Sequence, residues 1–276
     1  MAVTKFAKTI ALLAALLTGG AADGLAGESS AIVVEIESPL ASPHPLQGYL
    51  RRANNAGRAP AVVLLHSCHG NWKRLDERWG QRIASWGYAV LTVDSLGPRG
   101  LKTCEGRAPN DSADDAYRTL NFLVHDPLVD PDRIAVIGFA NGGRVALMSV
   151  ERGYLEQAAP AKFRAAVAFY PFCLGLKGEM TAPALILIGE FDDWALAREC
   201  RNLVEGRGDW GISRQKDKGA AIKLTVLAGA YHAFDAPQLT TPLLLKGHHL
   251  EFNQAATDQS IATLREFLDA TIGVKE

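Results

Sequence analysis

A chain of 276 residues is long enough for one large α/β domain. With 48% hydrophobic and 21% charged residues, it has the composition of a folded globular protein and not of a disordered one. The 29 basic and 30 acidic residues nearly cancel and no basic run occurs, which argues against a nucleic-acid partner or an anionic membrane surface.

The first 27 residues have the pattern of a secretory signal peptide. Two lysines precede an apolar run over residues 9–17, and mostly small residues follow up to Gly27. The run is shorter than the roughly 20 residues of a membrane-spanning helix, and no later stretch is long and apolar enough to span. We therefore expect a cleaved signal over residues 1–27, a domain over residues 28–276, and export to the periplasm or the medium. An uncleaved anchor or a buried first helix is the alternative.

Strands and helices alternate along the rest of the chain. Apolar runs predict strands, and apolar residues repeating every three or four positions predict helices. The predicted strands cover residues 31–37, 48–52, 59–66, 88–94, 133–139, 165–170, 184–189 and 222–227, and the predicted helices cover residues 73–86, 112–125, 142–152, 194–205 and 254–272. This alternation predicts one α/β domain whose mostly parallel sheet has helices on both faces.

Three details of this pattern concern the ends of elements and the loops. Ser112 and Asp115 resemble a capping box at the start of their helix. The segments 206–220 and 236–249 have no clear periodicity, and we expect both to be loops. The second loop would overhang the cleft in which a ligand binds.

The segment 138–143, with the sequence GFANGG, carries the first indication of function. It joins a buried strand to a helix, which is the context of the nucleophile elbow G-x-S-x-G of α/β-hydrolases. The central position of such an elbow is occupied here by Ala140. The free N–H groups at the start of the following helix could stabilise an oxyanion, and Asn141 would supply one of them.

Two further residues follow the elbow in the order typical of α/β-hydrolases. Asp192 lies just past the strand at 184–189, with Asp193 as its competitor. His232 lies in the loop after the last strand. An acid and a histidine in this order predict a pair in which the carboxylate orients the imidazole.

At these motifs the chain resembles the dienelactone hydrolase family, especially its exported bacterial members. The resemblance rests on LLHSCHG, DSLGPRG, VDPDRIAVIGFANGG, LIGEFDDW and YHAFD, and it extends over nearly all of the expected mature chain. It implies an α/β-hydrolase fold without a large cap domain and hydrolysis of a small ester or lactone by a Cys or Ser nucleophile, an Asp and a His. Asp192 and His232 match the family's acid and base, and the loop His66-Ser67-Cys68 matches its oxyanion loop, with the Cys68 N–H as a donor.

Ala140 departs from this pattern, because a methyl group cannot attack a carbonyl carbon. Removing a triad nucleophile costs on the order of a million-fold in kcat, although residual catalysis roughly a thousand-fold above water can remain. Three explanations are open: a natural relative without the nucleophile, an engineered substitution, or a nucleophile elsewhere, with Ser67 the first candidate and Cys68 the next. The sequence thus predicts a hydrolase with weak or no turnover or, alternatively, a non-catalytic small-molecule binding protein. Neither the substrate nor the oligomeric state follows from it.

The four cysteines predict two disulfides in an exported chain. Of the three possible connectivities, we expect Cys68–Cys104 and Cys173–Cys200, because each pair joins loops that should lie at the same edge of the sheet. Free buried thiols are the alternative.

No metal or cofactor is expected. The pairs His66/His69 and His248/His249 have spacings used by zinc ligands, but no third ligand lies at a suitable distance in the sequence. No P-loop or dinucleotide fingerprint occurs. Arg99 could pair with a substrate carboxylate, but we expect it to hold its own loop.

Overall fold

The computed structural model describes Met1 and residues 31–37, 45–53, 57–106, 109–207 and 218–273. The expected signal peptide, Met1 aside, lies outside the described residues. Within them, no helix is both long and apolar enough to cross a membrane.

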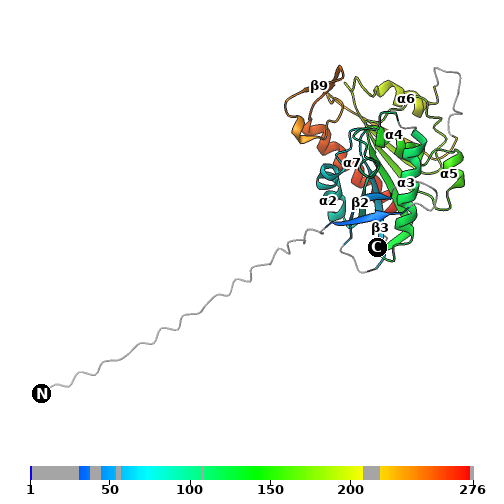
Figure 1. The fold of residues 1–276 in the computed structure, drawn as a ribbon. Coiled ribbons are helices and arrows are strands. Elements are labelled where there is room, and N and C mark those ends of the chain that lie inside the picture. The colour runs from blue at the N-terminus through cyan, green and yellow to red at the C-terminus, as the bar shows by residue number, and fades with distance from the viewer. Residues whose placement is uncertain (2–30, 38–44, 54–56, 107–108, 208–217, 274–276) are drawn as a thin grey trace.

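A mostly parallel sheet of eight strands forms the centre of the molecule, in the order β1-β2-β4-β3-β5-β6-β7-β8 (Figure 1). β1 pairs antiparallel with β2, β2 pairs antiparallel with β4, and every later pair is parallel. The strands are β1 (Ile32–Ile36), β2 (Leu46–Arg51), β3 (Ala59–Leu65), β4 (Ala89–Asp94), β5 (Val129–Phe139), β6 (Ala165–Phe169), β7 (Ala184–Gly189) and β8 (Ile222–Leu227). The predicted fold class is confirmed.

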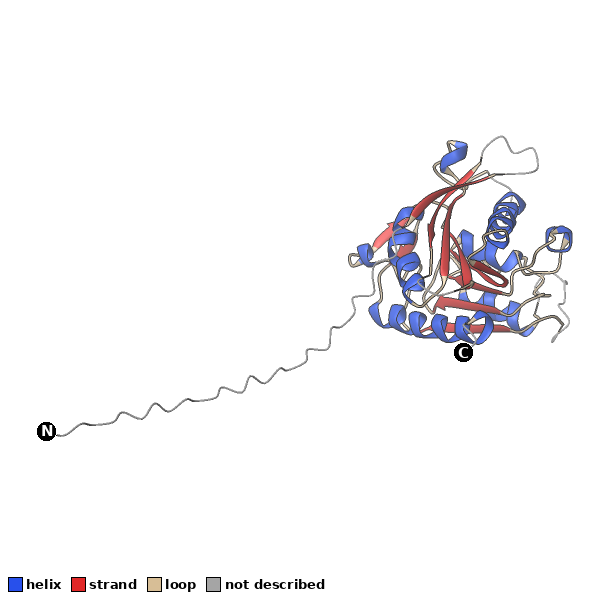
Figure 2. Ribbon diagram, turned by 90° about the horizontal axis from the view of Figure 1, so that it is seen from below, coloured by secondary structure: helices blue, strands red, loops and turns tan. Residues whose placement is uncertain are grey.

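Helices cover both sides of this sheet (Figure 2). Strands β3, β4, β6 and β7 are buried at every position, which explains why they are continuous apolar runs and do not alternate. The helices are α1 (Trp72–Leu75), continued by the π-helical turn η1 (Asp76–Gly80) and α2 (Gln81–Ser85), then α3 (Pro109–Val124), α4 (Asn141–Met148), α5 (Tyr154–Ala158), α6 (Ala197–Glu205) and α7 (Gln254–Ile272). A short 3-10 turn, η2 (Gly97–Arg99), follows β4.

The structure differs from the sequence prediction at the ends of several helices and strands. Helix α3 begins at Pro109, so Ser112 lies inside the helix and the predicted capping box is wrong. A proline fits the first turn, where no backbone N–H is needed. Strand β5 begins four residues early because its ladder with β3 contains an irregularity between Ala59 and Ala61. Helix α5 was not predicted.

The segment 236–249, predicted to be a loop, contains the 3-10 turn η3 (Pro237–Leu239) and a β-hairpin. The hairpin consists of β9 (Leu243–Leu245) and β10 (His248–Leu250), which pair antiparallel. Lys246 and Gly247 form its two-residue turn, and both have positive φ, as a type I′ turn requires. Three-residue strands are too short to give a periodic pattern, so the sequence did not reveal them.

Candidate active site

The turn between β5 and α4 has the strained backbone of a nucleophile elbow. Ala140 has φ 51° and ψ −113°, a backbone conformation that residues other than glycine rarely adopt. Its N–H donates to the Phe169 carbonyl at 2.9 Å. Holding such a conformation costs about 1–3 kcal/mol, and such strain gathers at functional sites. The elbow geometry is therefore present although the residue at its centre is alanine.

Glycines let this turn pack against the neighbouring strand. A Cβ on Gly142 would lie 2.5 Å from the carbonyl oxygens of both Leu65 and His66. A Cβ on Gly138 would collide with the carbonyl of Gly142 itself. The elbow thus rests directly on the end of β3, where the expected oxyanion loop starts.

His232 and Asp192, the predicted base and acid, lie together at the carboxyl edge of the sheet. The Nδ1 of His232 donates to Asp192 Oδ2 at 2.8 Å, and both side chains are almost fully buried. Asp192 Oδ1 accepts from the backbone N–H groups of Trp194 at 3.0 Å and Ala195 at 2.7 Å. These contacts fix the carboxylate and leave His232 Nε2 as the nitrogen able to accept a proton.

Asp193, the competing acid, points elsewhere. Its carboxylate accepts from the His249 N–H at 3.1 Å and lies 3.6 Å from His248 Nδ1. Asp193 therefore connects the β9–β10 hairpin to this loop and does not contact His232.

Asp235, a buried carboxylate that was not predicted as a site residue, holds the His232 loop in place. Asp235 accepts hydrogen bonds from Tyr170 Oη at 2.7 Å and Trp79 Nε1 at 2.6 Å, and it forms an ion pair with Arg78 at 3.0 Å. The Tyr170 ring lies against His232, with 4.7 Å between ring centroids. Burial, and then the neighbouring Asp235, raise the pKa of Tyr170 well above its usual range, so the phenol remains a donor. The YHAFD motif contained this aspartate, three residues after the histidine.

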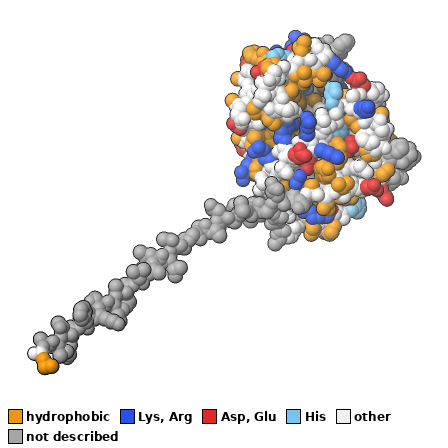
Figure 3. All heavy atoms as spheres, turned by 60° about the vertical axis from the view of Figure 1, so that its left-hand side comes forward, with side chains coloured by type: hydrophobic (Ala, Val, Ile, Leu, Met, Phe, Trp, Pro, Cys, Tyr) orange, Lys and Arg blue, Asp and Glu red, His pale blue; other side chains and the backbone are white. Residues whose placement is uncertain are grey.

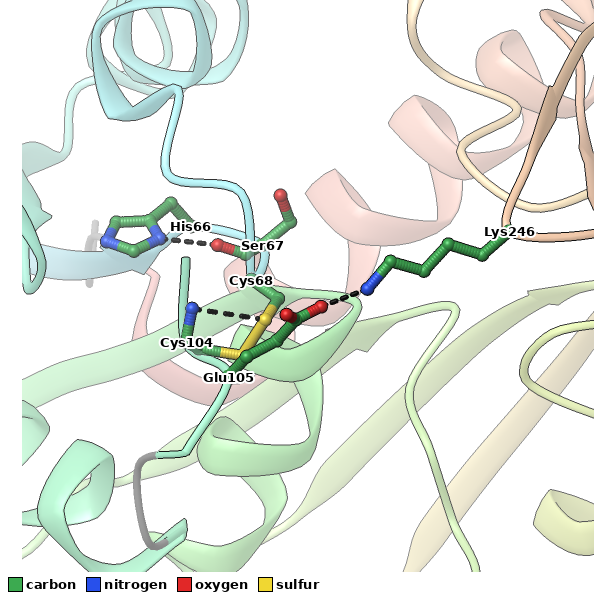
Figure 4. Close-up of a disulfide and its surroundings, with 6 residues drawn as sticks. All are labelled: His66, Ser67, Cys68, Cys104, Glu105 and Lys246. Carbon is green, nitrogen blue, oxygen red and sulfur yellow. Dashed lines mark hydrogen bonds and ion pairs between the residues drawn. A yellow bond between two sulfur atoms is a disulfide. The ribbon is translucent and has the colours of Figure 1, made fainter. Parts of the chain in front are cut away.

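The expected oxyanion loop after β3 is held by a histidine and a disulfide (Figure 4). His66 Nε2 accepts from the Ser95 N–H at 3.1 Å, and its Nδ1 donates to the Ser67 carbonyl at 2.6 Å. The Cys68–Cys104 disulfide joins the loop to the segment after η2. Since Cys68 has no free thiol, the alternative that Cys68 is the nucleophile is wrong.

The structure places both expected oxyanion donors beside Ala140. Asn141 is the first residue of α4, where backbone N–H groups have no partner inside the helix. The N–H of Cys68 donates no hydrogen bond to another described residue. Both residues line the same cavity as Ala140, so the geometry allows two N–H groups to converge on one oxygen.

A cavity of about 260 Å³ opens where these loops meet. Ala140, His232 and the expected oxyanion loop line it, together with Leu243, Leu245 and other apolar side chains of residues 236–250. Arg74 and Arg78 also line it, and no Asp or Glu side chain among the described residues does. Figure 3 shows a hollow with apolar walls on one face of the molecule, with basic side chains beside it.

Backbone strain is concentrated around this cavity. Of the five described residues other than glycine with positive φ, four line it: Asn71, Ala140, Tyr170 and Ala233. The fifth, Lys246, is at the tip of the β9–β10 hairpin. Since each such residue costs roughly 1–3 kcal/mol, the surrounding structure must hold them in place.

Side-chain contacts join the β9–β10 hairpin to other loops at this edge of the sheet. Lys246 at its tip forms an ion pair with Glu105, the neighbour of Cys104 (Figure 4). In strand β10, the His248 ring stacks on Trp194, 4.9 Å between centroids, and the His249 ring stacks on Tyr231, 3.9 Å between centroids. The segment expected to overhang the cleft therefore does so as an ordered wall of the cavity.

Two other expectations have clear outcomes. The second predicted disulfide, Cys173–Cys200, is confirmed. Arg99 forms two hydrogen bonds with Asp115 and one with the Ser95 carbonyl, so it holds its own loop as expected. Among the described residues, no cluster of histidine, cysteine and carboxylate side chains could hold a metal ion.

The sheet order and the strained strand-to-helix turn place the fold among the α/β-hydrolases. Within that class, the chain belongs to the dienelactone hydrolase family, whose sequence model matches residues 46–272.

Solved structures with the same fold include a dienelactone hydrolase-like promiscuous phosphotriesterase from metagenomic libraries. Its TM-score is 0.67 at 19% identity, covering 88% of this chain and 99% of that one. Esterase 2 of Thermogutta terrifontis phosphorylated by paraoxon has a TM-score of 0.65 at 19% identity, covering 88% and 95%. At such identities these likenesses concern the fold alone.

Two curated relatives are similar in sequence. A "Probable 2-oxo-3-(5-oxofuran-2-ylidene)propanoate lactonase" of Bradyrhizobium is 24% identical over 67% of this chain and 77% of its own length. Acylamino-acid-releasing enzyme 2 of rice is 25% identical over 59% of this chain, and the match spans only 20% of that longer protein.

Proposed function

We propose that this protein binds a small carboxylic ester or lactone in the cavity beside Ala140, and that the missing nucleophile leaves it with weak turnover or none. The observation that carries the proposal is the Asp192–His232 pair, which opens onto the same cavity as the strained elbow. His232 would act as base and then acid, Asp192 would orient it, and the N–H groups of Cys68 and Asn141 would bind the oxyanion.

The charge of the cavity supports a ligand with a negative group. Arg74 is exposed and has no ion-pair partner among the described residues, and the Nε of Arg78 is buried without a hydrogen-bond partner. A carboxylate on the ester or lactone would pair with the Arg74 guanidinium, since the Arg78 guanidinium already forms an ion pair with Asp235. The name of the Bradyrhizobium relative, a propanoate lactonase, agrees with this class of compound.

Hydrolysis of a short-chain nitrophenyl ester tests the site. We expect A140S to hydrolyse the ester at least about a hundred-fold faster than A140S/H232A, since a positioned base contributes 10²–10⁴-fold. Equal rates of these two variants, both folded, would contradict the assignment of His232.

Arg74 is tested separately through a ligand. Arg74→Ala should weaken binding of a short anionic ester at least about tenfold, because a hydrogen bond to a charged group contributes about 1.5–3 kcal/mol. Lys73→Ala is the matched control, since Lys73 is the exposed cation next to it and does not line the cavity.

The second candidate function is binding without catalysis, and Ala140 itself favours it. A dead relative would retain the cavity, bind the same esters or lactones and show no dependence of turnover on His232. Export is also part of the proposal: two disulfides suit an oxidising compartment, and the signal-like first 27 residues would direct the chain there.

A further inference from the structure

We propose that this chain is a hydrolase that uses water in place of a side-chain nucleophile, with His232 as the general base for a water molecule held beside the methyl group of Ala140. This inference rests on the proposed function of the cavity. It replaces the two-step covalent route of the family with direct attack on the carbonyl carbon.

The first support is the elbow itself. The backbone of Ala140 holds φ 51° and ψ −113°, and its side chain lines the cavity. A serine or cysteine here would place a nucleophilic atom over the sheet, and alanine leaves that position open to the cavity. The cavity, at about 260 Å³, is much larger than the roughly 30 Å³ of one water molecule.

The second support is a base without a side-chain partner. His232 Nδ1 is used by Asp192, and Nε2 makes no hydrogen bond to another described residue. In an enzyme with a serine nucleophile, Nε2 takes the serine proton. Here it can accept one hydrogen of a water molecule at the open position.

The third support is that neighbouring groups hold Asp192 and His232 in fixed positions. Asp192 is held by two backbone N–H groups, and the His232 ring packs against Tyr170, which Asp235 anchors. Four strained residues surround the cavity, and their cost is the same whether or not residue 140 can attack. The base and its orienting acid are therefore as rigid as a full triad requires.

The step balances with water as the only co-reactant. The water oxygen bonds to the carbonyl carbon while His232 Nε2 takes one water proton, and the carbonyl oxygen becomes an oxyanion at the N–H groups of Cys68 and Asn141. The carbonyl re-forms, the bond to the leaving oxygen breaks, and the imidazolium returns its proton to that oxygen. An ester yields an acid and an alcohol, and a lactone yields one hydroxy acid.

The test compares the unmodified mature protein with H232Q, H125Q and A140S, using a nitrophenyl ester at high protein concentration. H125Q is the matched control, because His125 is exposed directly after the end of α3 and does not line the cavity. Thermal unfolding of each variant confirms folding. We expect the unmodified protein and H125Q to exceed H232Q at least tenfold, with no burst in the first turnover and no acyl adduct by intact mass. Paraoxon should inactivate A140S only.

Each other outcome overturns the proposal in a distinct way. If the unmodified protein equals H232Q while A140S is active, the family site is intact and water attack is wrong. If the unmodified protein carries an acyl adduct, another side chain, Ser67 first, is the nucleophile. If A140S and the unmodified protein are both no faster than H232Q, the proposed catalytic role of the Asp192–His232 pair fails, and this inference fails with it.

Discussion

Replacing both cysteines of the Cys68–Cys104 disulfide by alanine should separate stability from the geometry of the site. The two cysteines are 36 residues apart in the sequence, so in the chain-entropy account their link stabilises the fold by about 3.8 kcal/mol. Cys173 and Cys200 are 27 residues apart, which gives about 3.6 kcal/mol. For a domain of this size, each loss corresponds to a fall in Tm of about 7–15 °C.

The two double variants should differ in catalysis although they are alike in stability. Cys68 lies in the expected oxyanion loop, and complete loss of one oxyanion donor typically costs 10²–10³ in kcat. C68A keeps the backbone N–H but frees the loop from the disulfide, so the N–H is displaced and part of that loss is expected. In the A140S background at 20 °C, where both variants remain folded, we expect C68A/C104A to lose at least about tenfold in kcat and C173A/C200A less than threefold. The assay is ester hydrolysis, with Tm measured in parallel. Full kcat in C68A/C104A would refute the claim that this disulfide positions the oxyanion loop.

Three further predictions concern other parts of the site. Asp235→Asn should destabilise the protein by about 3–5 kcal/mol in chemical denaturation, because it leaves the half-buried Arg78 without its counter-charge, whereas Asp193→Asn at an exposed carboxylate should change stability little. Gly142→Ala should abolish the activity of A140S, as measured by ester hydrolysis, since its Cβ would lie 2.5 Å from two carbonyl oxygens of the neighbouring strand end. Lys246→Ala removes an exposed ion pair, so Tm should stay within about 1 °C while limited proteolysis of the hairpin becomes faster.

The sequence predicted most of the fold, because its strands and helices carry strong local patterns. The strand at β8 and the helix α7 lie at the predicted residues, since a bounded apolar run and a long amphipathic repeat each have a clear beginning and end. Errors fell where local preference was weak. They include the first turn of α3, the irregular start of β5, the short helix α5 and the three-residue strands of the hairpin.

The sequence by itself determined the order of chemical groups: the alanine at the elbow, an acid, and then a histidine. It also restricted the cysteines to three pairings. These are properties of the chain order and of residue types, so no folding is needed to read them.

Only the tertiary structure decided which groups meet. It decided between Asp192 and Asp193 as the partner of the histidine. Asp192 contacts His232, whereas Asp193 accepts a hydrogen bond from the hairpin. It brought Asp235 into contact with Tyr170, whose ring packs against His232. It also placed two arginines, Arg74 and Arg78, in the lining of the cavity. Such contacts join residues up to 157 positions apart. Local patterns cannot specify them, because they depend on how the strands order themselves in the sheet and on which side chains then share one edge.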